Sequence, residues 1–326
     1  MKTNILRAPR APIIVSGWVT TTRLGLALLL TLMLLLAGCQ QSGNATTSSG
    51  PSLKVLATTT FLADIAQNVA GKRLQVDSLL PPGVDPHGFE PTPSDVRRIA
   101  DADVLIIHGQ GLEEFLARPL GASRPPSAST IEASAGLVPK QRSGAPTVSG
   151  EADMHYWLDP NLAQTYVDNI EKGLVAADPA GATEYQANAR QYKQQLQDLD
   201  AWIRNQVVTL SPERRLLVTD HEALGYYADR YDFRVVGAVV PSVTPGSQPS
   251  AQSLAALVTK IKETGAPAVF LEQGSNAQLA EQVARETGAK MAPELYVHYT
   301  SPPGGPAPTY IEMLKYDTSV IVQALR

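Results

Sequence analysis

Five histidines are the residues of this chain whose chemistry best suits holding a metal ion: His87, His108, His155, His221 and His298. None lies within four residues of another, so the chain has no local zinc motif such as His-Glu-x-x-His. Neutral imidazole suits Zn²⁺, whereas Mn²⁺ prefers carboxylate, carbonyl and water oxygens. A site that combines several of these histidines would therefore favour zinc, with copper and nickel as open alternatives.

The elements that must position these histidines alternate between strands and helices. Short runs rich in Val, Leu and Ile predict strands at 53–58, 74–79, 103–107, 216–219, 233–240, 268–271 and 293–297. Between them, apolar residues recur at steps of three and four and predict helices at 61–70, 94–101, 254–264 and 276–287. This order predicts an α/β fold with mainly parallel sheets that are flanked by helices.

Two long helices in succession interrupt the alternation. Asp159-Pro160 and Asp178-Pro179 each place a capping carboxylate before a proline at the first helical position. The second helix, expected over 180–209, carries one continuous apolar stripe and would be about 45 Å long.

This helix suggests a division of the chain into two lobes. We predict an N-terminal lobe at 53–178 and a C-terminal lobe at 213–326, each with a mainly parallel four-stranded sheet, joined by one long rigid helix at 179–212. An ordinary packing helix within one domain is the alternative. The segment 121–152, rich in Pro, Ser, Gly and Ala, predicts a loop with one short strand.

The N-terminus has the layout of a bacterial lipoprotein signal. Four basic residues precede or begin an apolar run that ends at Ala37-Gly38-Cys39. The run is shorter than the roughly 20 residues of a spanning helix. We therefore expect a signal peptide at 1–38, lipidation of Cys39 and a flexible tether at 39–52. An uncleaved N-terminal anchor is the alternative.

The composition of the mature chain narrows its location and partners. Cys39 is the only cysteine, so a thiolate cluster cannot form. Loss of residues 1–38 changes the formal charge from −4 to −8, which argues against a nucleic-acid partner. We expect a lipid-anchored monomer outside the cytoplasm, in the periplasm or on the outer face of the cytoplasmic membrane.

The predicted topology places the histidines near one edge of the fold. His87 follows the strand 74–79, His221 stands two residues past 216–219, and His298 directly follows 293–297. Ligands of open parallel sheets bind beyond the carboxyl ends of the strands. His155, ahead of the helix that begins near Asp159, could approach the same edge. Four unrelated loop histidines are the alternative.

Longer motifs around these residues resemble a known family. PPGVDPHGFEPTPSD (81–95), MHYWLDP (154–160) and TDHEALGYYADRY (219–231) are similar to the three ligand segments of substrate-binding proteins from zinc and manganese ABC importers, the cluster A-I family. FLE (270–272), ETG (286–288) and TYIEM (309–313) resemble its C-terminal lobe.

The resemblance implies a carrier that delivers a cation to a membrane permease and is not an enzyme. It implies ligands at His87, His155 and His221, and zinc importers of this family have histidine where manganese importers have glutamate at the third position. The fourth ligand is usually an aspartate, and His298 occupies that place here; Glu272 and a water are the alternatives for it. We predict Zn²⁺ as the cargo, with Mn²⁺ or iron as alternatives.

Nearby carboxylates are expected to support such a site. Four neutral imidazoles leave the charge of Zn²⁺ uncompensated in a partly buried cleft, which is costly. We predict that at least one carboxylate accepts the second ring N–H of a ligand histidine, the candidates being Glu272, Asp159, Asp220 and Glu222. Helix capping by Asp159 and solvent exposure of Glu222 are the alternatives, and His108 is expected to be structural or to support a ligand.

Two other functions use the same features. A zinc hydrolase would use Glu222 or Glu272 as its general base, but four protein ligands leave no coordination position open for a reacting water. A surface adhesin is compatible with a lipid anchor, although the sequence has no repeat or aromatic patch that favours adhesion.

Overall fold

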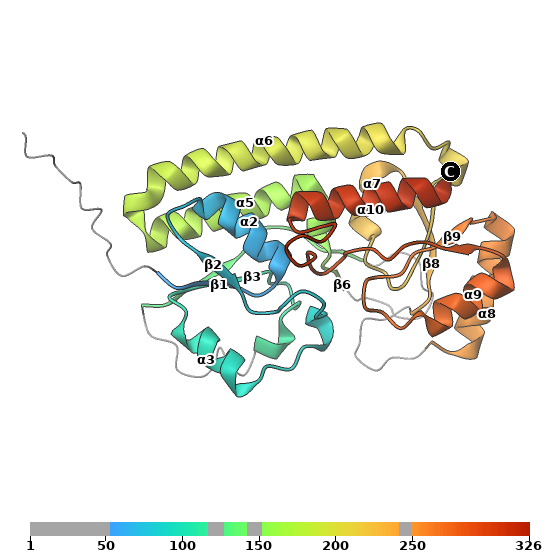
Figure 1. The fold of residues 1–326 in the computed structure, drawn as a ribbon, viewed down its shortest axis with the longest axis horizontal. Coiled ribbons are helices and arrows are strands. Elements are labelled where there is room, and N and C mark those ends of the chain that lie inside the picture. The colour runs from blue at the N-terminus through green and yellow to red at the C-terminus, as the bar shows by residue number, and fades with distance from the viewer. Residues whose placement is uncertain (1–52, 117–126, 142–151, 241–248) are drawn as a thin grey trace, which may run out of the picture. The chain divides into compact units, whose positions relative to one another are not determined.

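The computed structural model describes residues 53–116, 127–141, 152–240 and 249–326 (Figure 1). The predicted signal peptide, Cys39 and the tether lie outside these residues. Within the described ranges, no helix is both long enough and apolar enough to cross a membrane.

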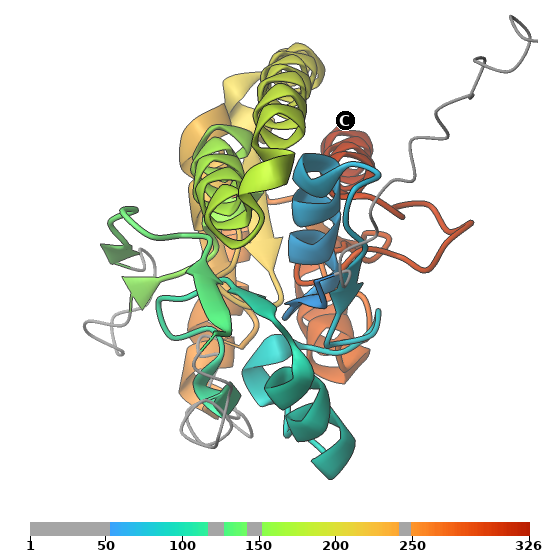
Figure 2. The ribbon, with the colours of Figure 1, turned by 90° about the vertical axis from the view of Figure 1, so that its left-hand side faces the viewer.

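The N-terminal part contains a four-stranded parallel sheet in the order β2-β1-β3-β4, with the bounds Val76–Ser78, Val55–Ala57, Val104–Ile107 and Ser129–Glu132. Residues alternate between its two faces. Val55 and Ile106 belong to the main core, which includes α2 (Thr60–Ala70), whereas Leu56 and Leu105 pack with Ile99 of α3 (Pro93–Asp101). Figure 2 shows α2 and α3 on opposite sides of these strands. The predicted parallel sheet flanked by helices is confirmed.

The C-terminal part contains two parallel strand pairs. β7 (Leu216–Thr219) pairs with β8 (Arg234–Ala238), and β9 (Ala268–Val269) pairs with β10 (Lys290–Met291). A single bridge between Thr219 and Phe270 connects the pairs. Three helices that follow these strands are α7 (Gly225–Tyr231), α8 (Ala251–Thr264) and α9 (Ala277–Thr287).

One predicted strand of this part is absent. The segment 293–297 forms only an isolated bridge, between Leu295 and Glu272. Pro293 has no N–H to donate to a ladder, and the strand of this region is instead the short β10 before it. Within the described residues, the second sheet is therefore two linked pairs and not one continuous four-stranded sheet.

The two long helices are present, but they begin differently. α5 (Pro160–Ala177) begins as predicted, because Asp159 accepts a hydrogen bond from the Asn161 N–H at 2.8 Å. The predicted cap at Asp178 is wrong. Its carboxylate accepts from Arg73 Nη2 at 2.9 Å and from the Tyr185 hydroxyl at 2.6 Å, and a 3₁₀ turn, η5 (Pro179–Gly181), precedes the α-helix.

The long helix α6 (Ala182–Val207) has 26 residues and a length of about 39 Å. The predicted apolar stripe is confirmed, because every member is buried: Tyr185, Ala189, Tyr192, Leu196, Leu199 and Ile203. The helix packs against α5, α2, α7 and the C-terminal helix α10 (Tyr310–Leu325) (Figure 1). It thus contacts helices from both ends of the described chain, while the division into two lobes stays a prediction.

Candidate metal centre

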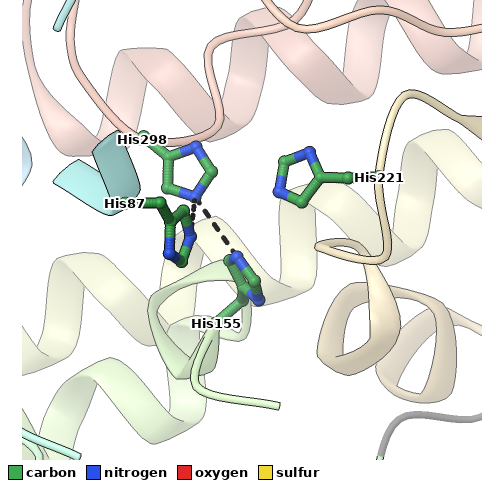
Figure 3. Close-up of side chains that lie close together, drawn as sticks. All are labelled: His87, His155, His221 and His298. Atoms are coloured by element: carbon green, nitrogen blue, oxygen red, sulfur yellow. Dashed lines mark hydrogen bonds between the residues drawn. The ribbon is translucent and has the colours of Figure 1, made fainter. Parts of the chain in front are cut away.

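The structure brings His87, His155, His221 and His298 together. One ring nitrogen of each lies within 4.8 Å of those of the other three, and Figure 3 shows the four rings around a common centre. The Nε2 atom of His298 lies 3.1 Å from Nε2 of His87 and 3.2 Å from Nε2 of His155. Zn–N bonds near 2 Å in a tetrahedron place nitrogens about 3.3 Å apart, close to these two distances, and any pair nearer the 4.8 Å limit would have to approach for this ion.

Each histidine comes from a turn or loop next to a regular element. His87 lies in the 3₁₀ turn η2 (Pro86–Gly88), where the Asp85 carboxylate accepts the His87 N–H at 2.8 Å. His155 directly precedes the turn η4 (Tyr156–Leu158). His221 follows the carboxyl end of β7, and the Thr219 hydroxyl donates to its carbonyl at 2.7 Å.

His298 lies in the loop between β10 and α10, beside the second histidine segment. The indole N–H of Trp157 donates to the carbonyl of Val297 at 2.7 Å. Two segments that are about 140 residues apart in the chain are therefore tied together next to the cluster. The side chains of His155 and His298 are fully buried, whereas His87 and His221 are half-buried.

Carboxylates lie close to the outer nitrogen, Nδ1, of three of these rings. Glu272 Oε1 lies 2.5 Å from His298 Nδ1 and accepts the His298 backbone N–H at 3.2 Å. Its other oxygen, Oε2, lies 3.6 Å from His221 Nδ1. Asp153 Oδ1 lies 2.8 Å from His155 Nδ1 and accepts the His155 backbone N–H at 3.0 Å.

These contacts determine which nitrogen faces the centre. An ionised carboxylate only accepts hydrogen bonds, so Nδ1 of His155 and of His298 carries the ring hydrogen. The Nε2 lone pairs of both rings then point toward one another across 3.2 Å. Two facing lone pairs repel unless a proton or a metal cation lies between them, so this geometry suits a bound cation.

The electrostatic environment of the cluster is negative. Burial lowers the pKa of His298, but the charge and hydrogen bond of Glu272, together with the charges of Asp85 and Asp220, outweigh it and raise that pKa. Burial raises the pKa of Asp220, while the hydrogen bond from Ser275 lowers it. Carboxylates from three separate segments thus attract positive charge to this place.

The four carboxylates predicted to support the site differ in what they contact. Glu272 contacts His298 and lies near His221, and the carboxylate of Asp220 lies within 4.8 Å of ligand atoms of His221 and Glu272. Asp159 caps α5, which was the alternative role given for it above, and its Oδ1 lies 3.7 Å from Arg230 Nε. Glu222 is half-buried next to His221 in the chain.

Asp153 was not predicted from the sequence, although a local signal for it exists. Asp85 and Asp153 each stand two residues before a histidine, in the pattern Asp-x-His. In both cases the carboxylate accepts the histidine's backbone N–H, which is the Asx turn that aspartate commonly forms. The repeated pattern could have identified Asp153.

His108 lies outside this cluster. Its ring is fully buried against Tyr156, Trp157 and Tyr166, and its Nδ1 lies 2.8 Å from the Gly109 carbonyl oxygen. Burial lowers the pKa of His108 to about 4, so the ring is neutral at pH 7. It packs beneath the segment that holds His155, which agrees with the structural role expected for it.

Comparisons with known proteins identify the family. The sequence model of the family described as "Zinc-uptake complex component A periplasmic" matches residues 55–324. "Manganese-binding lipoprotein MntA" of Halalkalibacterium halodurans is 33% identical over 297 residues, which cover 91% of this chain and 96% of that protein. "Iron-binding protein YfeA" of Yersinia pestis is 33% identical over 280 residues, which cover 86% and 88% of the two chains.

Solved structures agree with this match. The periplasmic zinc-binding protein TroA of Treponema pallidum superposes with a TM-score of 0.77 at 28% identity, covering 84% of this chain and 99% of that one. A manganese-bound periplasmic metal-binding protein from candidatus liberibacter asiaticus gives 0.76 at 29% identity, covering 84% and 100%. The predicted α/β fold and the resemblance to cluster A-I are both confirmed.

Each of these four relatives is named as a metal-binding protein. Their names differ in the metal, so the comparisons leave manganese, iron and zinc open. The chain belongs to the family described as "Zinc-uptake complex component A periplasmic", and it is an extracytoplasmic metal-binding protein of the ABC-transporter substrate-binding class.

Proposed function

We propose that this protein binds Zn²⁺ through His87, His155, His221 and His298 and delivers it to the permease of an ABC importer. The observation that supports zinc is the donor set. All four groups that converge within 4.8 Å are imidazoles, and Glu272 lies close to the outer nitrogens of two of them, His298 and His221. A cation at the centre would meet nitrogen, which suits zinc better than manganese.

A second candidate is a manganese or iron carrier, and one observation favours it. Asp220, His221 and Glu272 also offer ligand atoms within 4.8 Å of one another, and two of these three groups provide oxygen. A shift of a cation toward them would give the mixed oxygen and nitrogen set that Mn²⁺ prefers. The names of the manganese- and iron-binding relatives agree with this alternative.

Metal titration separates the two candidates. The chelator-stripped mature protein is titrated with Zn²⁺ and Mn²⁺ by calorimetry, with a competing chelator where binding is too tight to measure directly. We expect zinc to bind at least about a hundredfold more tightly than manganese, in line with the order of affinities of nitrogen sites. Tight manganese binding with weak zinc binding would replace the zinc proposal by the second candidate.

Single substitutions test the donor set. His298→Ala should weaken zinc binding strongly, because it removes a ring at the centre of the cluster. Glu281→Ala, in an exposed carboxylate of α9, is the control and should bind zinc as the wild type does. Unchanged zinc affinity in His298→Ala would remove this residue from the site.

Attachment to the membrane is the second part of the proposal. Cys39 closes the apolar run of the N-terminus, where a lipoprotein signal places its modified cysteine. Cells that express the protein are given a radiolabelled fatty acid, and the label should enter the wild type but not Cys39→Ser. Equal labelling of both proteins would contradict lipidation at this residue.

A further inference from the structure

We propose that Asp153 is a positioning residue for His155, and that Gly225 keeps open the space that the Asp153 carboxylate needs. Through this contact, the segment that carries His155 and the segment that carries His221 would be coupled. The inference rests on the proposed function, because it concerns how a metal-binding imidazole is oriented.

Asp153 is placed to fix both the position and the tautomer of His155. Its side chain is buried, and Oδ1 lies 3.0 Å from the backbone N and 2.8 Å from the ring Nδ1 of His155. The first contact fixes the main chain of the histidine, and the second keeps hydrogen on Nδ1 and a lone pair on Nε2. Carboxylates behind metal-binding histidines act in this way and also make the ring more basic.

The backbone of Asp153 is attached to α7. Asp153 lies in β6 (Ala152–Asp153), which pairs in antiparallel fashion with β5 (Lys140–Gln141). The Tyr226 hydroxyl donates to the Asp153 carbonyl at 3.1 Å and accepts from the Lys140 backbone N–H at 2.9 Å. Since α7 begins four residues after His221, both histidine segments share this anchor.

Gly225, the first residue of α7, faces the Asp153 carboxylate directly. A Cβ atom built on Gly225 would lie 2.5 Å from Asp153 Oδ2 and 3.7 Å from its Cγ. The glycine does not have a left-handed backbone, and helices favour alanine over glycine. The space taken by Asp153, and not the backbone conformation, therefore accounts for glycine at this position.

The carboxylates of Asp153 and Glu272 also affect the net charge around a bound ion. Asp153 and Glu272 each contact the outer nitrogen of a ligand ring. When ionised, they would together supply two negative charges to offset the two positive charges of a divalent cation held at the four imidazoles. The site could therefore compensate the ion while it keeps a nitrogen donor set that selects against manganese.

A double-mutant cycle tests the coupling. Asp153→Ala should weaken zinc binding about 10- to 100-fold, the usual effect of removing such a carboxylate. Gly225→Ala should weaken it about tenfold, because the added methyl group displaces the carboxylate. In the Asp153→Ala background, Gly225→Ala should cause no further loss, since its methyl group then has nothing to displace. Equal losses in both backgrounds would refute the coupling.

A second measurement reads the tautomer without any metal. Nitrogen-15 shifts of the histidine rings in the metal-free protein should show His155 with hydrogen on Nδ1. Asp153→Ala and Gly225→Ala should move the population toward hydrogen on Nε2. Asp153→Asn keeps an oxygen acceptor, so it should retain the wild-type tautomer while zinc binding weakens through the lost charge. A wild-type tautomer in Asp153→Ala would overturn the positioning role.

The two measurements separate failure of this inference from failure of the proposed function. If the wild type does not bind zinc, the proposed function fails, and the ring shifts still test the role of Asp153. If the wild type binds zinc and the Asp153 and Gly225 variants match it in both measurements, only the positioning role is refuted. Asp168→Ala, at an exposed carboxylate of α5, is the control, and thermal unfolding shows that each variant is folded.

Discussion

Replacement of Glu272 gives a direct measure of how a carboxylate outside the donor set contributes to zinc binding. Glu272 contacts the outer nitrogen of His298 at 2.5 Å and lies 3.6 Å from that of His221. Glu272→Gln keeps an oxygen that can accept the His298 N–H but removes the charge. Glu272→Ala removes both, so the two variants separate orientation from charge.

The expected losses follow from the geometry. The path from the carboxylate through the His298 ring to a bound ion is about 6 Å, with a Zn–N bond near 2 Å. Coulomb attraction between −1 and +2 over this distance is about 5 kcal/mol at an effective dielectric constant of 20, before the cost of removing both charges from water is subtracted. Measured losses for such carboxylates are about 10- to 100-fold, or about 1.4 to 2.8 kcal/mol. We expect about tenfold for Glu272→Gln and about a hundredfold for Glu272→Ala.

The assay is competition between the protein and a chelator of known zinc affinity, at constant pH and ionic strength. Glu281→Ala, at an exposed position of α9, controls for the loss of one negative charge far from the cluster. Zinc affinity of Glu272→Ala equal to that of the wild type would refute the role assigned to this residue. Equal losses in both variants would show that charge alone, and not orientation of the ring, accounts for the effect.

Three further predictions concern the metal preference, the pH dependence and the core. His298→Asp should lower the preference for zinc over manganese about tenfold, because an oxygen donor replaces a nitrogen donor; an unchanged ratio in parallel titrations would contradict this. Burial raises the pKa of Asp64 to about 6, so between about pH 4 and pH 6 the folded chain keeps a proton that the unfolded chain loses, and stability falls as pH rises. Urea denaturation should therefore show the wild type losing about 2 kcal/mol relative to Asp64→Asn between pH 4 and pH 7, and a constant difference would argue against the shift. Leu196→Ala, in the buried stripe of α6, should cost about 2–5 kcal/mol of unfolding free energy, whereas the exposed Gln195→Ala should change it by less than about 0.5 kcal/mol.

The sequence predicted those features of the fold that depend on local periodicity. The buried stripe from Tyr185 to Ile203 and the strand at 216–219 are present as expected, because burial on one face leaves a regular trace in the order of residues. The convergence of the histidines could be anticipated from the carboxyl ends of the strands, together with the motifs of the family.

Features that depend on partners distant in the chain could not be predicted in this way. Asp178 was expected to cap a helix, but it pairs with Arg73, which lies 105 residues away. The contact between Glu272 and His298 joins two loops that no periodic pattern connects. Asp153 could have been found from its local Asx turn, but the β5–β6 pair and Tyr226 of α7, which hold its backbone, come together only in the folded chain.

The four imidazoles of the proposed zinc site differ in burial, so the site has an outer pair that faces solvent and an inner pair that is buried. His87 and His221 reach solvent, whereas His155 and His298 do not. An incoming ion would exchange its first waters for the outer pair and reach the inner pair last. Release would follow the reverse order. A docking partner would need to move only the loops that carry the outer pair, and the inner pair would stay in place for the next ion.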